Sequence, residues 1–432
     1  MKKIRLYFPI LAAALLLLCT GLTTEAAKGS NATGASLPQY KQIVTLTIDA
    51  DDFEKSLKAS YKEAEENATN EVQYKLVIPP GNHDTSSALK LYSNMHIYAV
   101  GATINATGEL SSIFRSDSES MKNIVIEGGT WTTKKQTSLN IIGSTLLRLA
   151  HITNLHIKDA AFLVNRNGHI IEFSDAYNVT IERCKISGNN ISGSLQPKEA
   201  IQLDISTEAA MPGPIPYNGK GCHNFIIRNN IFSQVARGVG SHNFSGIGVE
   251  KIPYSNITIS ENTFKSSTGE AVFIQFWRNA TISKNKISNA HRAGIYLHLS
   301  RNNLIKQNTV SKTKMFTGER KKTYGDMADG IILNQSYKNK ISKNKISSCR
   351  KTGIRIYLES SNNALTNNQI SKCKTSGIFV EYSKTPAITA NILKNNKGYG
   401  IRIHGKAYAA SLKKLKRKNR FSKNKPGKVL VK

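Results

Sequence analysis

Acidic residues are scarce in this sequence of 432 residues. It holds 29 Asp and Glu against 60 Lys and Arg, which gives a formal net charge of +31 at pH 7. Such an excess attracts anionic polymers through long-range fields, although Lys-rich surfaces also serve simply to keep a protein soluble. We find no recognisable nucleic-acid-binding motif, so we do not expect nucleic acid as the partner.

Long apolar stretches are also rare. One, Ile10 to Cys19, follows three basic residues and precedes a small-residue cleavage site, and it is too short for a comfortable membrane span. We therefore predict that residues 1–26 are a secretion signal. No second apolar stretch follows, so the mature protein should have no transmembrane segment and should be extracellular or associated with the cell wall.

Helix-length apolar patterns are missing from most of the chain, and short alternating runs repeat instead. Residues 279–301 read NATISKNKISNAHRAGIYLHLSR, and close variants of this unit recur on both sides. One Asn marks the register at steps of 23 or 24 residues wherever no loop is inserted. The predicted column consists of Asn230, Asn262, Asn285, Asn308, Asn344, Asn368, Asn391 and Asn424.

A fixed period of this length indicates stacked coils, none of which can bury its apolar face alone. The runs are too short for helices, so the coils should be made of strands and form a parallel β-helix. Asn tolerates a left-handed corner, and its amide can hydrogen-bond along a stack. We therefore interpret the Asn column as structural.

The repeat resembles the pectin-lyase-like superfamily of right-handed parallel β-helix proteins over about residues 44–425. A strand that ends in Pro79-Pro80-Gly81 and is followed by Gly-Ala-Thr-Ile resembles the opening coils of that superfamily. The resemblance implies an all-β, single-stranded right-handed parallel β-helix (solenoid) with an N-terminal capping helix. We predict a signal peptide at 1–26, a flexible lead-in at 27–42, the β-helix at 43–425, its capping helix at 51–66 and a basic C-terminal segment at 406–432.

Cysteine is sparse, and no Cys-x-x-Cys metal spacing occurs. Cys349 and Cys373 each lie five residues after an Asn of the column, so they should stack on adjacent coils. Neighbouring strands are about 4.8 Å apart, which is within reach of a disulfide. Two alternatives stay open: a bridge, or two small buried thiols.

Aligned coils predict files of outward side chains. In the run 294–298, Ile295 and Leu297 should point inward, and Tyr296 and His298 outward. His169 falls in an inward register, which indicates an interior histidine. The first file is Glu172, Asp204, His242, Gln275, His298, Asn334, Tyr357, Glu381 and His404; the second is Gln202, Gly240, Phe273, Tyr296, Ile332, Arg355, Phe379 and Arg402; the third is Glu199, Arg237, Glu270 and Asp329.

The centre of these files combines acid–base groups with aromatics. Carboxylates and imidazoles supply general acids and bases, aromatics supply flat area for a sugar ring, and a guanidinium can grip a carboxylate. The predicted catalytic residues are Asp204, His242, Glu199, Glu270 and Arg237, with Asp204 and His242 as the acid–base pair. The predicted substrate-binding residues are Gln202, Phe273, Gln275, Tyr296 and His298.

The strings KEAIQLD (198–204) and RGVGSH (237–242) resemble a pair seen in secreted bacterial β-helix proteins of the superfamily. The Gly-His-Gly and Arg-Ile-Lys strings of polygalacturonases and the Asp-Pro-His string of mannuronan epimerases are missing. No calcium cluster like that of pectate lyases is visible. We therefore predict no cofactor, with calcium as an alternative that lacks a clear site.

These observations predict a secreted, carbohydrate-active β-helix protein that binds an anionic polysaccharide or cell-wall polymer and cleaves it. Two carboxylates in reach would fit hydrolysis. A base beside Arg237 would fit β-elimination. One alternative is a non-catalytic glycan-binding or adhesin module; another is a metal site, since His242 and His298 share a file.

Overall fold

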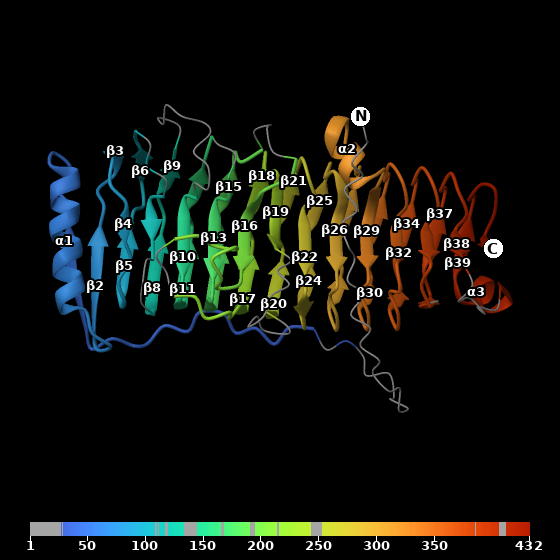
Figure 1. The fold of residues 1–432 in the computed structure, drawn as a ribbon, viewed down its shortest axis with the longest axis horizontal. Coiled ribbons are helices and arrows are strands. Elements are labelled where there is room, and N and C mark those ends of the chain that lie inside the picture. Colours follow the sequence, from blue (N-terminus) through green and yellow to red (C-terminus); the bar gives the residue numbers. More distant parts are fainter. Residues whose placement is uncertain are drawn as a thin grey trace, which may run out of the picture.

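The computed structural model describes residues 27, 29–108, 110, 112–116, 120–133, 145–165, 168–190, 195–213, 216–242, 253–384, 386–405 and 412–432. The chain winds as a right-handed parallel β-helix, and three long parallel sheets run along its axis (Figure 1). This confirms the predicted fold class. The predicted secretion signal at 1–26 lies outside the described residues.

The three sheets take one strand each from nearly every coil, so neighbours within a sheet are one coil apart in sequence. Sheet A has, in spatial order, β1 (Gln42–Thr47), β2 (Val72–Val77), β5 (Met95–Tyr98), β8 (Met121–Glu127), β11 (Ile152–Lys158), β14 (Tyr177–Glu182), β17 (Cys222–Arg228), β20 (Tyr254–Ser260), β24 (Thr281–Ser283), β27 (Leu304–Lys306), β30 (Lys340–Ser342), β33 (Ala364–Thr366) and β36 (Ala387–Thr389), with β23 (Trp277–Arg278) also paired to β20.

Sheet B has β3 (Gly81–Thr85), β6 (Ala102–Ala106), β9 (Thr130–Thr132), β12 (Ala161–Leu163), β15 (Lys185–Ser187), β18 (Ile231–Ser233), β21 (Thr263–Lys265), β25 (Lys286–Ser288), β28 (Thr309–Ser311), β31 (Lys345–Ser347), β34 (Gln369–Ser371), β37 (Ile392–Lys394) and β39 (Arg420–Ser422). Sheet C has β4 (Leu89–Lys90), β7 (Phe114–Arg115), β10 (Leu147–Ala150), β13 (Ile171–Ser174), β16 (Glu199–Asp204), β19 (Arg237–Ser241), β22 (Val272–Gln275), β26 (Arg292–His298), β29 (Ala328–Asn334), β32 (Ile354–Tyr357), β35 (Ile378–Glu381), β38 (Ile401–His404) and β40 (Val429–Val431).

Three helices accompany the coils in the described part of the chain. The predicted capping helix is α1 (Phe53–Asn67), which covers the N-terminal end and buries Phe53, Leu57 and Tyr61 (Figure 1). The second helix, α2 (Gly318–Tyr324), stands on an insertion before β29. The third, α3 (Leu412–Lys418), lies at the C-terminal end. No helix among the described residues is long and apolar enough to cross a membrane.

Inward aliphatic side chains fill the coil, because alternate residues of every strand face the interior. Ile282 of β24 and Ile287 of β25 are buried, and their equivalents on the next coil are Ile305 and Val310. Cys349 and Cys373 are buried within this core as free thiols. Of the two alternatives for this pair, the structure therefore has the unbridged one.

The Asn column forms the expected hydrogen-bonded ladder, with two differences. Asn308 donates from its amide to Asn344 Oδ1 at 3.0 Å, and this bond repeats from coil to coil. After Asn391 the ladder continues to Asn419, whereas Asn424 pairs with Asn396 in a separate file. The left-handed conformation also falls one residue before the ladder position, for example at Gln307 with φ 58°.

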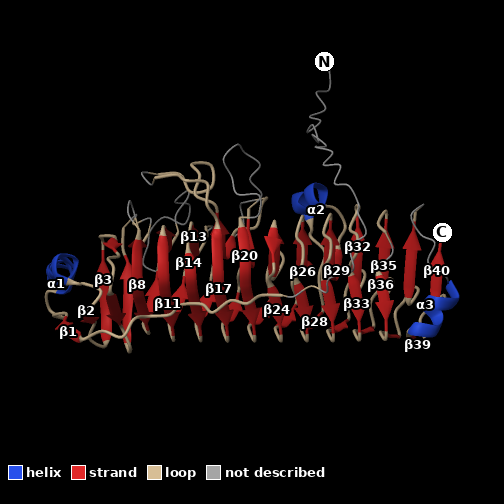
Figure 2. Ribbon diagram, turned by 90° about the horizontal axis from the view of Figure 1, so that it is seen from below, coloured by secondary structure: helices blue, strands red, loops and turns tan. Residues whose placement is uncertain are grey.

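The lead-in differs from the flexible segment that its composition predicts. Residues 29–41 lie extended across the outer face of sheet A and reach β1 (Figures 1 and 2). The main-chain N–H groups of Ser30, Thr33 and Ala35 donate to side chains of β24, β17 and β14 at 2.7–2.9 Å. Polar outward side chains of the sheet thus fix a strap that local composition could not reveal.

The predicted C-terminal boundary at residue 425 is too short. Strands β39 and β40 continue sheets B and C to Val431, and α3 buries Leu415 against the last coils. The described part of the basic C-terminal segment, 412–432, therefore belongs to the β-helix and closes its end. Its lysines and arginines lie largely exposed on that end.

Candidate functional site

The outer face of sheet C carries the predicted files of side chains. Phe273 lies beside Tyr296, and Gln275 lies beside His298, on the neighbouring strands β22 and β26. Phe273 and Tyr296 pack with Ile332 into a small apolar cluster outside the coil, and the two rings are 5.0 Å apart. This face therefore combines aromatic area with polar side chains, as the sequence predicts.

Glu172 departs from its predicted file. It lies beside Gln202, and Ser174 occupies the place beside Asp204. Glu172 therefore belongs to the second file, two residues away from the expected position along the strand. Burial raises the pKa of Glu172 to about 7.

A buried network of ion pairs lies beneath the predicted site. Arg237 donates through Nη1 to Glu199 Oε1, and through Nε and Nη2 to Glu270 Oε2 at 2.9 Å. Arg292 binds the other oxygen of Glu270, also at 2.9 Å. The Arg237 residue is only 2% exposed. The guanidinium of Arg237 is thus engaged inside the protein. The sequence predicts that it grips a substrate carboxylate, and the structure shows it bound to two internal carboxylates instead.

The two glutamates of this network stay ionised. Burial opposes the charge on Glu199, but the positive charge of Arg237 outweighs it and holds the pKa of the carboxyl at about 2. Burial likewise opposes the charge on Glu270, and Arg237 and Arg292 outweigh it and lower its pKa. Glu199 is bound to Arg237 and Glu270 to Arg237 and Arg292, so neither carboxylate is free for the predicted role of a second carboxylate in hydrolysis.

Asp204 is also fully buried. The amide of Gln202 donates to its Oδ2 at 2.5 Å and approaches His242 Nδ1 at 2.6 Å. Burial, reinforced by the charge of Glu172, raises the pKa of Asp204 well above its ordinary range. Asp204 therefore holds a proton behind His242. Gln202, predicted to bind substrate, is buried and links these two side chains instead.

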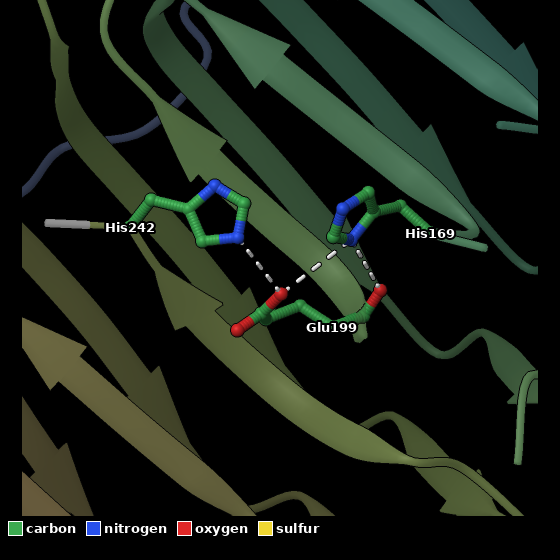
Figure 3. A group of neighbouring side chains, drawn as sticks. All are labelled: His169, Glu199 and His242. Carbon is green, nitrogen blue, oxygen red and sulfur yellow. Dashed lines mark hydrogen bonds and ion pairs between the residues drawn. The ribbon is translucent and has the colours of Figure 1, made fainter. Parts of the chain in front are cut away.

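His169 belongs to this cluster, although its register predicts an interior histidine. Its Nδ1 lies 3.1 Å from the main-chain oxygen of Glu199 and 3.5 Å from Oε2 of the same residue (Figure 3). His242 Nε2 approaches that Oε2 at 3.7 Å. Burial lowers the pKa of His169 to about 3 and also lowers the pKa of His242, so both rings are neutral at pH 7.

A groove of about 620 Å³ lies over the outer face of sheet C, from β19 to β32. Both long insertions contribute to it, through Ala209 on one and Tyr324 of α2 on the other, as expected for loops that wall a binding face. Its lining consists of Gln196, Ala209, Arg237, His242, Phe273, Gln275, Arg292, Tyr296, His298, Tyr324, Asn334 and Tyr357.

The hydrogen bonds of Gln275 set the protonation of His298. Gln275 Nε2 donates to the main-chain oxygen of Ser241 at 3.0 Å, so its Oε1 faces His298 Nδ1 at 3.1 Å. An amide oxygen can only accept, so Nδ1 carries the proton and Nε2 keeps its lone pair. Nε2 lies 3.3 Å from Oε1 of Gln335, and the exposed amide of Gln335 can turn so that its NH₂ group faces Nε2 instead. Burial lowers the pKa of His298, which leaves a neutral ring suited to accept a proton.

Two tyrosines form a proton-donating pair in the same groove. Asn334 Nδ2 donates to the Tyr296 hydroxyl at 2.9 Å, and Arg292 Nη2 lies 3.4 Å from it. Tyr296 therefore donates its own proton to the hydroxyl of Tyr357, at 2.8 Å. Burial raises the pKa of Tyr357, so it holds a proton that it can pass on.

Comparison with known proteins bears on the fold. A family model described as "Right handed beta helix region" matches residues 219–325 and 316–421. The Streptococcus pneumoniae surface protein and adhesin PfbA has a similar structure, with 16% identity and a TM-score of 0.56 over 95% of this chain and 100% of that chain. This protein is a right-handed parallel β-helix of the pectin-lyase-like fold.

Two further solved structures resemble this β-helix. The A-module of the Azotobacter vinelandii mannuronan C-5 epimerase AlgE6 is 12% identical, with a TM-score of 0.51 over 89% of this chain and 94% of that chain. The tailspike of E. coli bacteriophage HK620, solved with a pentasaccharide, is 11% identical, with a TM-score of 0.53 over 89% of this chain and 78% of that chain. No curated protein sequence matches. At these identities the likeness concerns the fold alone.

The β-helix thus divides the predicted site residues into two sets. His242, Phe273, Gln275, Tyr296 and His298 line the groove together with Arg237, whose charged end is engaged beneath it. Asp204, Glu199, Glu270 and Gln202 are buried and do not line it. Among the other residues that line the groove, Asn334 and Tyr357 belong to the first predicted file of outward side chains. Arg292, which begins β26, was overlooked in the sequence analysis.

Proposed function

We propose that this β-helix is a secreted, carbohydrate-active protein that binds an anionic polysaccharide in the groove of sheet C and cleaves it by β-elimination. The groove carries this proposal, because it holds a neutral imidazole, a tyrosine pair and Arg292 in one place. The net charge of +31 favours an anionic polymer. The HK620 tailspike, with its bound pentasaccharide, is a precedent for a sugar on this fold.

The groove offers a role for each reacting group. His298 Nε2 takes the proton from the carbon beside a uronate carboxyl, and the bond from the neighbouring carbon to the glycosidic oxygen breaks. Tyr357 returns a proton to that leaving oxygen and is re-protonated through Tyr296. Arg292 faces the uronate carboxyl; its Nε is buried without a hydrogen-bond partner among the described residues. The products are an unsaturated uronate end and a new hydroxyl.

Elimination fits this geometry better than hydrolysis. Hydrolysis by the usual route needs two carboxyl groups that flank the scissile bond, one of them protonated. Glu199 and Glu270 are ionised and bound to arginines, and Asp204 is buried behind His242. No carboxyl group lines the groove in the part of the chain that the structure describes.

A second candidate is a glycan-binding module without catalysis, exposed at the cell surface. The observation in its favour is the same burial, because every predicted catalytic carboxyl group is engaged within the protein. PfbA, which has a similar fold, is described as a surface adhesin. Such a module should bind anionic glycans in a salt-sensitive manner and release no product.

The test incubates the purified mature protein with a panel of polyuronates and cell-wall glycans. We follow the ultraviolet absorbance of unsaturated uronates and the appearance of reducing ends. Absorbance that falls at least about 100-fold in His298→Ala and in Tyr357→Phe supports elimination, since general acid–base groups contribute about 10²–10⁴-fold. His404→Ala, in the same file but outside the groove, is the matched control.

Two results would overturn the proposal. Reducing ends without absorbance would mean hydrolysis and would exclude His298 as the eliminating base. Salt-sensitive binding without any product would establish the glycan-binding module.

A further inference from the structure

Three side chains from consecutive strands of sheet C converge beside the groove. His169 lies just before β13, Glu199 begins β16, and His242 directly follows β19 (Figure 3). One ligand-type atom from each lies within 4.8 Å of the other two. His169 is the member that register places inside the coil, so the sequence did not indicate this cluster.

The two distances from Glu199 to the histidines are close to those of atoms that share an ion. Glu199 Oε2 lies 3.5 Å from His169 Nδ1 and 3.7 Å from His242 Nε2, beyond good hydrogen-bond distances. Two ligand atoms each about 2.1 Å from a tetrahedral zinc ion lie about 3.4 Å apart. An ion among the three atoms would be coordinated by all of them. This coordination would take the place of the two long contacts and of the hydrogen bond from His169 Nδ1 to the main-chain oxygen of Glu199.

Unsatisfied buried oxygens point to the same place. Glu199 is 0% exposed, yet its Oε2 has no hydrogen-bond partner in the described structure. Its other oxygen is held by Arg237, which fixes the carboxylate in position. Asp204 Oδ1 also lacks a hydrogen-bond partner and lies 3.5 Å from His242 Nδ1. At metal sites a group behind the histidine fixes the ring and leaves the far ring nitrogen for the ion. Here Asp204 reaches His242 through the side-chain amide of Gln202, which lies 2.5 Å from Asp204 Oδ2 and 2.6 Å from His242 Nδ1.

We propose that His169, Glu199 and His242 bind one divalent first-row transition metal ion, with zinc as the representative. Two imidazoles and one carboxylate form a ligand set of catalytic zinc and non-haem iron sites, and they leave coordination positions open. Calcium and magnesium prefer sets of oxygen ligands, so they fit less well. This site departs from the prediction of no cofactor and from the alternative that paired His242 with His298.

His242 also lines the groove, so the ion would lie beside the groove at its β19 end. This role rests on the proposed function: a cation there would attract the carboxylates of an anionic polysaccharide. The ion itself does not depend on that role and can be measured without any sugar.

The test uses tag-free mature protein that has been stripped with a chelator. Zn²⁺ is titrated by calorimetry, and Co²⁺ is added to record its visible absorption, which reports coordination geometry. We expect one Zn²⁺ per chain. Affinity should fall at least about 100-fold in His242→Ala and in His169→Gln, which retains a polar side chain at a buried position. Asp204→Asn should weaken binding about 10–100-fold, as removal of an outer-shell partner does.

His404→Ala is the matched control, since this histidine of sheet C lies outside the cluster, and it should leave affinity unchanged. Circular dichroism checks that each variant is folded. The proposal is overturned if the wild-type protein shows no saturable Zn²⁺ binding. It is also overturned if His242→Ala and His169→Gln, both folded, bind Zn²⁺ as the wild type does. Because no sugar is present, neither outcome bears on the elimination assay.

Discussion

A substitution at Arg237 distinguishes two roles for this side chain, which are to grip a substrate carboxylate or to act as an internal counter-ion. Arg237→Met keeps an apolar stem but leaves Glu199 and Glu270 buried without this cation. Loss of one partner from a buried ion pair costs about 3–5 kcal/mol, and we take about 3 because Glu270 keeps Arg292. Loss of the guanidinium from the Phe273 ring, 4.1 Å away, adds about 1 kcal/mol. We therefore expect a loss of about 4 kcal/mol in the free energy of unfolding.

The assay is equilibrium unfolding in guanidinium chloride, followed by the fluorescence of the two tryptophans. Arg402→Met is the matched control, because Arg402 lies on the same sheet, in the second file, and over a Phe ring but is exposed; we expect a change within about 1 kcal/mol. Glu199→Gln in the Arg237→Met background should restore part of the loss. A wild-type unfolding midpoint in Arg237→Met, together with weaker polyuronate binding, would refute this reasoning.

Three further predictions are measured by equilibrium unfolding or by limited proteolysis. Asn308→Ala removes four ladder hydrogen bonds and leaves two buried main-chain groups unpaired, which should lower the free energy of unfolding by about 2–6 kcal/mol. The control Asn82→Ala, at an exposed position, should lower it by less than about 0.5 kcal/mol. Equal losses in the two variants would contradict the role of the ladder. Gly34→Val, at φ 69° and against sheet A, should release the strap and speed limited proteolysis within 29–41; unchanged resistance would argue against a fixed strap. At Glu182, burial opposes ionisation, but hydrogen bonds from two arginines and a histidine outweigh it and hold its pKa at about 2, below the ordinary 4.5. Its contribution is therefore full above pH 4.5 and lost as the pH falls toward 2, so Glu182→Gln should flatten this acid loss in unfolding titrations, and an unchanged pH dependence would count against it.

The repeat could be predicted because contacts in a solenoid are periodic. Residues one coil apart in sequence become neighbours in a sheet, so counting from one Asn placed Phe273 beside Tyr296 and Gln275 beside His298. Counting failed where the period is interrupted. Glu172 was shifted by two residues, and the end of the ladder moved from Asn424 to Asn419, because inserted segments change the spacing.

The sequence by itself determined the coil, its register and the candidate face, since periodic apolar residues must point inward. Only the tertiary structure decided which outward side chains meet solvent. Glu199 and Arg237 follow the outward register, yet they are buried and paired with each other. His169 joins them from the irregular segment just before β13. Burial depends on what covers a face, and the path of an irregular segment depends on distant coils, so neither is encoded in the local alternation of residues.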